Sequence, residues 1–122
     1  MDLINQSDEE ILYIATPIMD NLMEGSTEID WEKHTCDHTE RAKRVITKEE
    51  LERQCKEYQS RFGFFAGREF MGVTRHQDYV NIIWKQIMSK SPNEFTAILS
   101  LVQNEDRYLV ERCWVDLWEP KS

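Results

Sequence analysis

Apolar residues recur at helical spacing near the start of the chain. They form one face over residues 7–26, and its members are Ile11, Ile14, Ala15, Ile18, Met19 and Leu22. Ser7 and Glu10 have the spacing of a capping box, which predicts where the helix begins. Pro17 lies inside the run and predicts either a kink or a second segment that Thr16 caps. The sequence EGST, residues 24–27, is expected to end this helix.

Two further helical stretches are expected before residue 63. Residues 28–46, EIDWEKHTCDHTERAKRVI, form the first, with Asp30 as its cap and few apolar anchors. The capping box of Thr47 and Glu50 begins the second. Its apolar positions fall at intervals of four, three and four residues, at Leu51, Cys55, Tyr58 and Phe62. Gly63 supplies the left-handed residue at which helices often end.

After Gly63 the apolar period changes from helical to two, which is typical of strands. Residues 68–90 predict two strands around a turn at HQD, residues 76–78. Residues 93–103 and 107–118 predict two more, joined by a turn at NEDR. Helices followed by strands indicate an α+β fold with a meandering antiparallel sheet. We expect a single domain over residues 1–122, helical over about 7–63 and sheet over about 64–118.

The strand at YVNIIWKQIM is apolar on both of its faces. One face carries Tyr79, Ile83 and Ile87, and the other carries Val80, Ile82, Trp84 and Met88. A sheet with one face in water alternates more cleanly between apolar and polar residues. Helices can cover one face, and a second copy of the chain is the simplest cover for the other. The sequence therefore predicts a homodimer.

Composition excludes several classes of partner. The 122 residues hold 23 acidic and 15 basic side chains, for a net charge of −8, without a basic cluster for nucleic acid or an anionic membrane. No apolar run reaches the roughly 18 residues that span a bilayer. The first ten residues contain no basic or apolar signal region. Three widely spaced cysteines are typical of reduced thiols, so we expect a cytoplasmic protein.

The order of these features resembles the nuclear transport factor 2-like superfamily, and in particular small stand-alone prokaryotic members with no assigned function. The similarity is carried by PIMDNLMEG, DWEKH, DHTE, VITKEELERQ, FGFFAGREFMGV, DYVNIIWK and YLVERCWV, which span about residues 11–118. The resemblance implies three helices packed on a strongly curved antiparallel sheet. This arrangement is a cone that often encloses a pocket, and it is frequently dimeric through the outer face of the sheet.

The sequence HTCDH, residues 34–38, places four side chains that can bind a metal or a proton within five positions. On one helix, His34 and His38 would share a face one turn apart, which can chelate a divalent ion. No CxxC or HExxH motif supplies further ligands. The resemblance implies inward aromatic residues at these two positions. The alternatives are hydrogen-bonded core histidines, and pocket walls that bind a polar ligand or accept a proton.

Taken together, these features predict a non-catalytic module that binds a small ligand or a protein and associates with itself through its sheet. We expect no cofactor. The candidate pocket-lining residues are Trp31, His34, His38, Tyr58, Phe62, Trp84 and Trp114. An isomerase or cyclase with a pocket in the cone is the first alternative, with Asp116 as a candidate acid or base. A metal-binding protein that uses His34 and His38 is the second.

Overall fold

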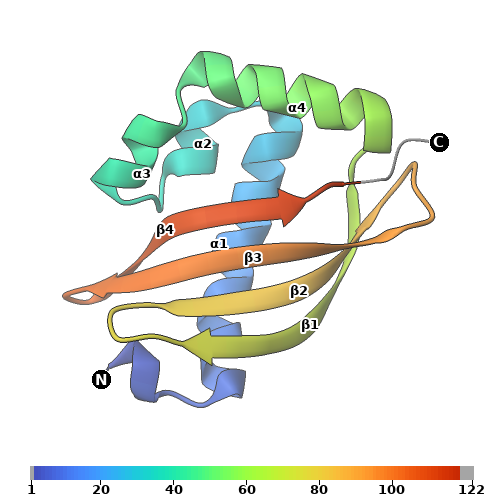
Figure 1. Ribbon diagram of the computed structural model, residues 1–122. Coiled ribbons are helices and arrows are strands. Elements are labelled where there is room, and N and C mark those ends of the chain that lie inside the picture. Colours follow the sequence, from blue (N-terminus) through green and yellow to red (C-terminus); the bar gives the residue numbers. More distant parts are fainter. Residues whose placement is uncertain (1, 119–122) are drawn as a thin grey trace.

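Helices come first and strands second in the computed structural model, which describes residues 2–118 (Figure 1). A 3₁₀ turn at Leu3–Asn5 precedes four α-helices: α1 Asp8–Glu28, α2 Trp31–Thr35, α3 Glu40–Val45 and α4 Lys48–Phe62. The strands are β1 Phe65–Arg75, β2 Val80–Met88, β3 Glu94–Asn104 and β4 Arg107–Asp116. The α+β class is confirmed. The expected number of three helices is wrong, because the second predicted helix is divided into α2 and α3.

Helix α1 is longer than the sequence predicts. Its start is as expected, since the Ser7 hydroxyl accepts a hydrogen bond from the backbone N–H of Glu10 at 3.1 Å. Pro17 lies inside α1 without ending it. The residues EGST belong to the helix as well, and its C-cap is Ile29, at φ 54°. The expected second segment capped by Thr16 and the expected end at EGST are therefore wrong, while a kink at Pro17 stays a prediction. The reason is tertiary, because Gly25 and Ser26 are buried where α2 and α4 pack against α1.

The segment between α2 and α3 pairs with the sheet. His38 and Val110 form an isolated parallel bridge. The Thr39 N–H donates to the Val110 carbonyl at 2.9 Å, and the Val110 N–H donates to the Asp37 carbonyl at 2.6 Å. The Thr39 hydroxyl then accepts from the Ala42 N–H, which begins α3. The two histidines therefore do not share one continuous helix, contrary to the sequence expectation.

The four strands form an open antiparallel meander in the order β1-β2-β3-β4, with turns where HQD and NEDR predict them. One face packs on α1 through buried residues, among them Val80, Ile82, Trp84, Ala97, Leu99, Leu101 and Val110. In Figure 1, α1 crosses behind the sheet, while α2, α3 and α4 lie beyond its β4 edge.

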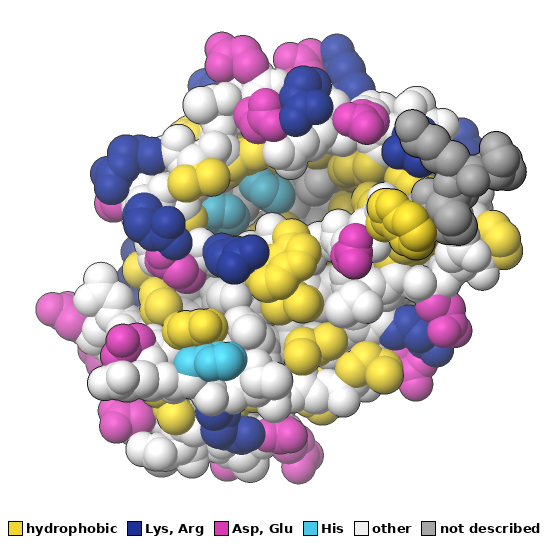
Figure 2. Space-filling model, viewed as in Figure 1, with side chains coloured by type: hydrophobic (Ala, Val, Ile, Leu, Met, Phe, Trp, Pro, Cys, Tyr) yellow, Lys and Arg dark blue, Asp and Glu magenta, His cyan; other side chains and the backbone are white. Residues whose placement is uncertain are grey.

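The opposite face of the sheet has no helix over it in the described part of the chain (Figure 1). Ile83 and Ile98 are directly opposed in the pairing of β2 with β3, and both are half-buried. Met71 on β1 is 62% exposed. Figure 2 shows apolar side chains over the strands on this face. Apolar residues therefore occur on both faces of the sheet, as the sequence indicates, although this face also carries Lys85 with its ion pairs to Glu69 and Glu94.

Among the described helices, none combines the length and apolar character that crossing a bilayer requires.

Candidate functional site

A hollow of about 310 Å³ opens between α1, α4 and β4, and a histidine side chain is visible inside it (Figure 2). We call it the α4–β4 hollow. Its volume is at the lower end of the range of roughly 300–1,000 Å³ for ligand pockets. The apolar part of its wall includes Leu22, Met23, Leu51, Phe62, Phe65, Val115 and Leu117. The hollow therefore has the size and lining of a site for a compact molecule.

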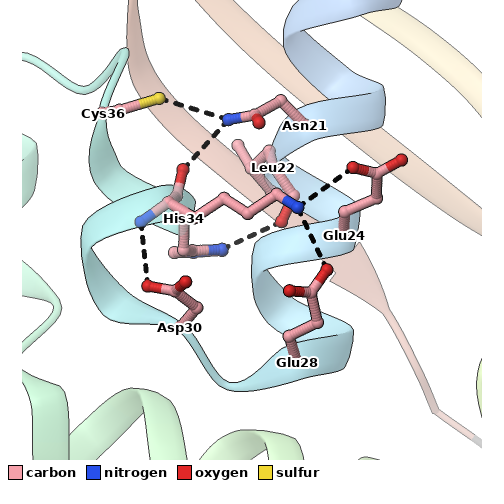
Figure 3. Close-up of polar contacts among 8 residues, drawn as sticks. Asn21, Leu22, Glu24, Glu28, Asp30, His34 and Cys36 are labelled. Atoms are coloured by element: carbon pink, nitrogen blue, oxygen red, sulfur yellow. Dashed lines mark hydrogen bonds and ion pairs between the residues drawn. The ribbon is translucent and has the colours of Figure 1, made fainter.

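Hydrogen bonds and ion pairs hold α2 against α1, and α2 in turn forms one wall of the hollow (Figure 3). The Asn21 side-chain amide donates to the Lys33 carbonyl at 3.0 Å. The Lys33 ammonium lies 3.2 Å from a Glu24 oxygen and 3.0 Å from a Glu28 oxygen. Asp30 caps α2 by accepting from the Lys33 N–H. A helix of only five residues is thereby held in one position.

Gly25 allows the backbones of α1 and α2 to approach closely. A Cβ atom on Gly25 would lie 2.6 Å from the backbone nitrogen of His34 and 2.7 Å from its Cα. Real Cβ contacts are essentially never below 3.0 Å. A side chain at residue 25 would therefore push α2, and His34 with it, away from α1.

His34 brings its imidazole to the wall of the hollow. Its Nδ1 lies 3.1 Å from the Leu22 carbonyl (Figure 3). Because a carbonyl oxygen can only accept, Nδ1 carries the proton and Nε2 carries the lone pair. Nε2 has no hydrogen-bond partner in the described part of the chain. Burial lowers the pKa of His34 below its ordinary value, so the ring is neutral at pH 7.

His38 lies beside His34 but outside the hollow. The two ring centroids are 5.4 Å apart. His38 is only 8% exposed, and within residues 2–118 its Nδ1 is buried without a hydrogen-bond partner. Burial lowers the pKa of His38 to about 4, and repulsion from His34, once that ring is protonated, and from Lys43 adds to the effect. His38 borders a separate groove at the outer edge of β4, with Lys43 and Leu109.

Three further polar groups of the hollow form one hydrogen-bonded cluster. The Ser26 hydroxyl lies 2.9 Å from the Tyr58 hydroxyl and 3.3 Å from the Cys55 sulfur. Burial raises the pKa of both Tyr58 and Cys55. Burial also raises the pKa of Cys113, across the hollow on β4, to about 12. All four groups are therefore protonated and uncharged at pH 7, like the neutral ring of His34.

The charged residues that border the hollow lie at its rim. Glu57 and Arg61 are one turn apart on α4, and both are exposed to solvent. Gln54, also exposed, precedes them on the same side of the helix. Charge is thus found where water solvates it, while the interior offers neutral groups only.

Four of the seven predicted pocket residues line the hollow: His34, Tyr58, Phe62 and Trp114. The other three, which are Trp31, His38 and Trp84, lie elsewhere, and so does the candidate acid Asp116. Trp31 donates from its indole N–H to the Ile46 carbonyl at 2.7 Å, beside a different depression. Trp84 is buried in the core below the Arg68 guanidinium, which lies 5.1 Å from its ring centroid. Asp116 is exposed at the end of β4 and is not part of the wall.

Sequence reasoning missed several residues of the wall. Leu22 belongs to the apolar stripe of α1, whose members the pattern assigns to the core without distinction, and Met23 lies next to it outside the predicted stripe. Ser26 falls in the stretch that was expected to end α1. Cys55 lies in the α4 stripe and Cys113 on a strand, so each has a local signal for burial but none for a shared cavity.

The metal alternative gains no support from the geometry. Among residues 2–118, no three His, Cys, Asp or Glu side chains come together in a way that could hold a metal ion. His34 already commits Nδ1 to a carbonyl, which leaves it one nitrogen for coordination. A structural zinc site needs four ligands, and a catalytic one usually needs three from the protein.

The structure defines an α+β protein in which an open antiparallel meander packs on α1 and a hollow lies beside its last strand. A solved structure with this fold is Bd1075 of Bdellovibrio bacteriovorus, with a TM-score of 0.50 and 12% sequence identity. The similarity covers 88% of this chain and 40% of that chain, so the match spans less than half of Bd1075. At this identity it shows the fold alone. No protein-family model matches the sequence, and no curated protein does.

Proposed function

We propose that this protein is a non-catalytic module that binds a small molecule in the α4–β4 hollow. The observation that carries the proposal is the pairing of an apolar wall with a neutral imidazole whose Nε2 has no partner in the described part of the chain. Ligand sites commonly combine apolar walls with a few well-placed polar groups. The polar contacts between α1 and α2 hold that imidazole in place before a ligand arrives.

A small-molecule isomerase or cyclase is the alternative, and it has less support. An effective general base has a pKa near the working pH. Burial lowers the pKa of His34, which weakens it as a base. The one acid considered for this role, Asp116, is exposed and outside the wall of the hollow. Binding therefore describes the site better than proton transfer does.

We also propose that the fold is the cone of the nuclear transport factor 2-like superfamily. Its support is the order of elements, with helices before a β1-β2-β3-β4 meander, and a hollow between sheet and helices. A crystal structure with a flat or parallel sheet would contradict the cone.

We propose a cytoplasmic location for the protein, because its three cysteines are free thiols. A disulfide in protein purified from cells without reductant would contradict this location.

Filling the hollow tests ligand binding. Val115 is a half-buried part of the wall, and Val115→Trp should occupy the space that a ligand needs. In backbone-amide NMR titrations with indole, ethylbenzene and cyclohexanol, we expect shifts in residues 22–26, 55–62 and 113–117 of the unchanged protein. Val115→Trp should weaken this binding at least about tenfold. Val45→Trp is the matched control, because Val45 is 72% exposed on α3. If none of the three compounds shifts these amides at millimolar concentration, the proposed function is wrong.

We further propose that the protein pairs with itself through the face of the sheet opposite α1. Its support is the band formed by Ile83, Ile98 and Met71 on strands that no described helix covers. Apolar side chains gathered on an uncovered face commonly mark an interface. Closed twofold dimers are the commonest oligomers, and they bury one patch against its own copy.

Placing a charge on this band should break the pair. We expect Ile98→Lys to convert a dimer at micromolar concentration into a monomer of 14.6 kDa, as measured by sedimentation. An unpaired charge buried at an interface costs several kcal/mol. Val45→Lys, on an exposed helical surface, should leave the dimer intact. Sedimentation of the unchanged protein as a monomer alone would contradict the proposal.

A further inference from the structure

We infer that the ligand of the α4–β4 hollow is a compact, neutral alcohol or phenol whose O–H donates a hydrogen bond to Nε2 of His34. This inference rests on the proposed function and adds the chemical class of the ligand. It follows from three properties of the hollow: the tautomer of His34, the absence of charge in the interior, and the shape of the walls.

The tautomer of His34 determines whether the ligand must be the donor or the acceptor of the hydrogen bond. The Leu22 carbonyl lies 3.1 Å from Nδ1 and fixes the ring proton there. Nε2 then offers a lone pair and no proton. A ligand carbonyl, ether oxygen or carboxylate has only lone pairs to present, so it cannot bond to this atom. A hydroxyl or N–H group on the ligand can. A hydroxyl can in addition accept a hydrogen bond from the hydroxyl and thiol donors of Ser26, Tyr58 and Cys55, whereas a neutral N–H only donates, so the hollow favours a hydroxyl.

The lack of interior charge excludes ionised ligands. His34, Ser26, Cys55, Tyr58 and Cys113 are all neutral at pH 7, for the reasons given above. A buried carboxylate or ammonium would lose its hydration without gaining an opposite charge. The rim residues Glu57 and Arg61 are exposed and carry opposite charges, so they give no preference for one sign at the entrance.

The shape of the walls favours a ring of modest size. Tyr58 and Phe65 lie with their ring centroids 4.9 Å apart, and Phe62 is buried nearby on α4. Aromatic side chains pack well against the faces and edges of other rings. A volume of about 310 Å³ suits one ring with a short substituent. These features together point to a small substituted phenol or cyclic alcohol.

Two matched compounds test the hydrogen bond on the unchanged protein. We would titrate 4-ethylphenol and 1-ethyl-4-fluorobenzene, which have nearly the same shape but differ in the hydroxyl donor. Backbone-amide NMR shifts would locate binding and give both dissociation constants. We expect 4-ethylphenol to bind about tenfold more tightly, because the fluoro compound leaves Nε2 buried without a donor. The anion 4-ethylbenzoate should bind at least tenfold more weakly than the phenol.

Two variants test whether the preference for the phenol depends on the His34 ring. His34→Phe keeps a ring of similar size but removes the acceptor, so the tenfold preference for the phenol should disappear. His38→Phe changes the neighbouring ring, which lies outside the hollow, and should keep the preference. The comparison of the two compounds needs no variant, so it stands even if His34→Phe folds poorly.

The outcomes separate this inference from the proposed function. Equal affinities for the phenol and the fluoro compound, with shifts at the hollow, would overturn the ligand class and leave ligand binding intact. A preference that survives in folded His34→Phe would also overturn it. If neither compound nor the benzoate shifts the amides of the hollow, this inference and the proposed function both fail.

Discussion

Gly25→Ala is expected to lower the free energy of unfolding by about 2 kcal/mol, because overpacking a well-packed site costs up to about 3 kcal/mol and only part of this is offset. The new Cβ would lie 2.6 Å from the His34 backbone nitrogen. A flexible side chain could move aside, but this neighbour is backbone, and Asn21 and Lys33 hold it in place. The cost should exceed the gain of up to about 1 kcal/mol from replacing glycine within a helix. Urea denaturation monitored by tryptophan fluorescence measures the difference.

Gly67→Ala is the matched control for this substitution. A Cβ on Gly67 would have no atom within 4 Å, apart from its own chain neighbours. We expect the free energy of unfolding to change by less than about 0.5 kcal/mol, as for surface positions generally. If Gly25→Ala were as stable as Gly67→Ala, α1 and α2 would not be in contact as described. The wall that His34 forms would then lose its support.

Acidification should destabilise the protein through His38. The pKa of this ring is about 4 in the folded chain, against an ordinary value of 6.5. The unfolded chain therefore binds the proton first as the pH falls. Stability is complete above pH 6.5 and decreases progressively between pH 6.5 and 4, by up to about 3 kcal/mol. His34 contributes in the same direction, because its pKa is also lowered.

His38→Phe isolates this contribution. Urea denaturation of both proteins at pH 7.5 and pH 5 gives the loss of stability for each. The loss should be smaller by about 1–2 kcal/mol in His38→Phe, since phenylalanine does not titrate. The paired carboxylates Glu32, Glu50, Glu52 and Glu69 have pKa values below 4.5, so they titrate mainly below this window. Equal losses in the two proteins would place His38 in solvent rather than in the core.

Much of the fold can be predicted from local patterns, because those patterns describe interactions within a few residues. Ser7, Asp30 and Thr47 cap helices as their positions indicate. Gly63 ends α4 with a positive φ of 82°. The turns at HQD and NEDR lie between the strands that they were expected to join. In each case the residue type determines the backbone conformation directly.

The errors arise where a distant segment determines the local structure. Thr39 was expected inside a helix, but it bonds to Val110, far along the chain on β4, and caps α3 instead. Gly25 was expected near a helix end, yet it lies within α1 because the α2 backbone packs on it. Neither contact can be predicted from the neighbouring sequence, because helical spacing describes only interactions within a few residues.

The candidate site was predictable in part for the same reason. His34, Tyr58 and Phe62 stand out as polar or aromatic residues on faces that should be inward, and they line the hollow. Trp84 has the same kind of signal but lies in the core. An inward-facing residue lies in the core where a helix packs directly over it, and it lines the hollow where no helix does. Which of the two applies depends on the position of α4 relative to β4. Only the tertiary arrangement supplies that information.

The central claim is that His34 presents a neutral acceptor to the α4–β4 hollow, and imidazole nitrogen NMR tests it most directly. Long-range ¹⁵N spectra of the ligand-free protein, recorded from pH 7.5 to 4.5, report which ring nitrogen carries the proton. We expect a proton on Nδ1 alone at pH 7.5 and a pKa below 6.5 for His34. A ring that is protonated on Nε2, or that titrates like free imidazole, would contradict the central claim.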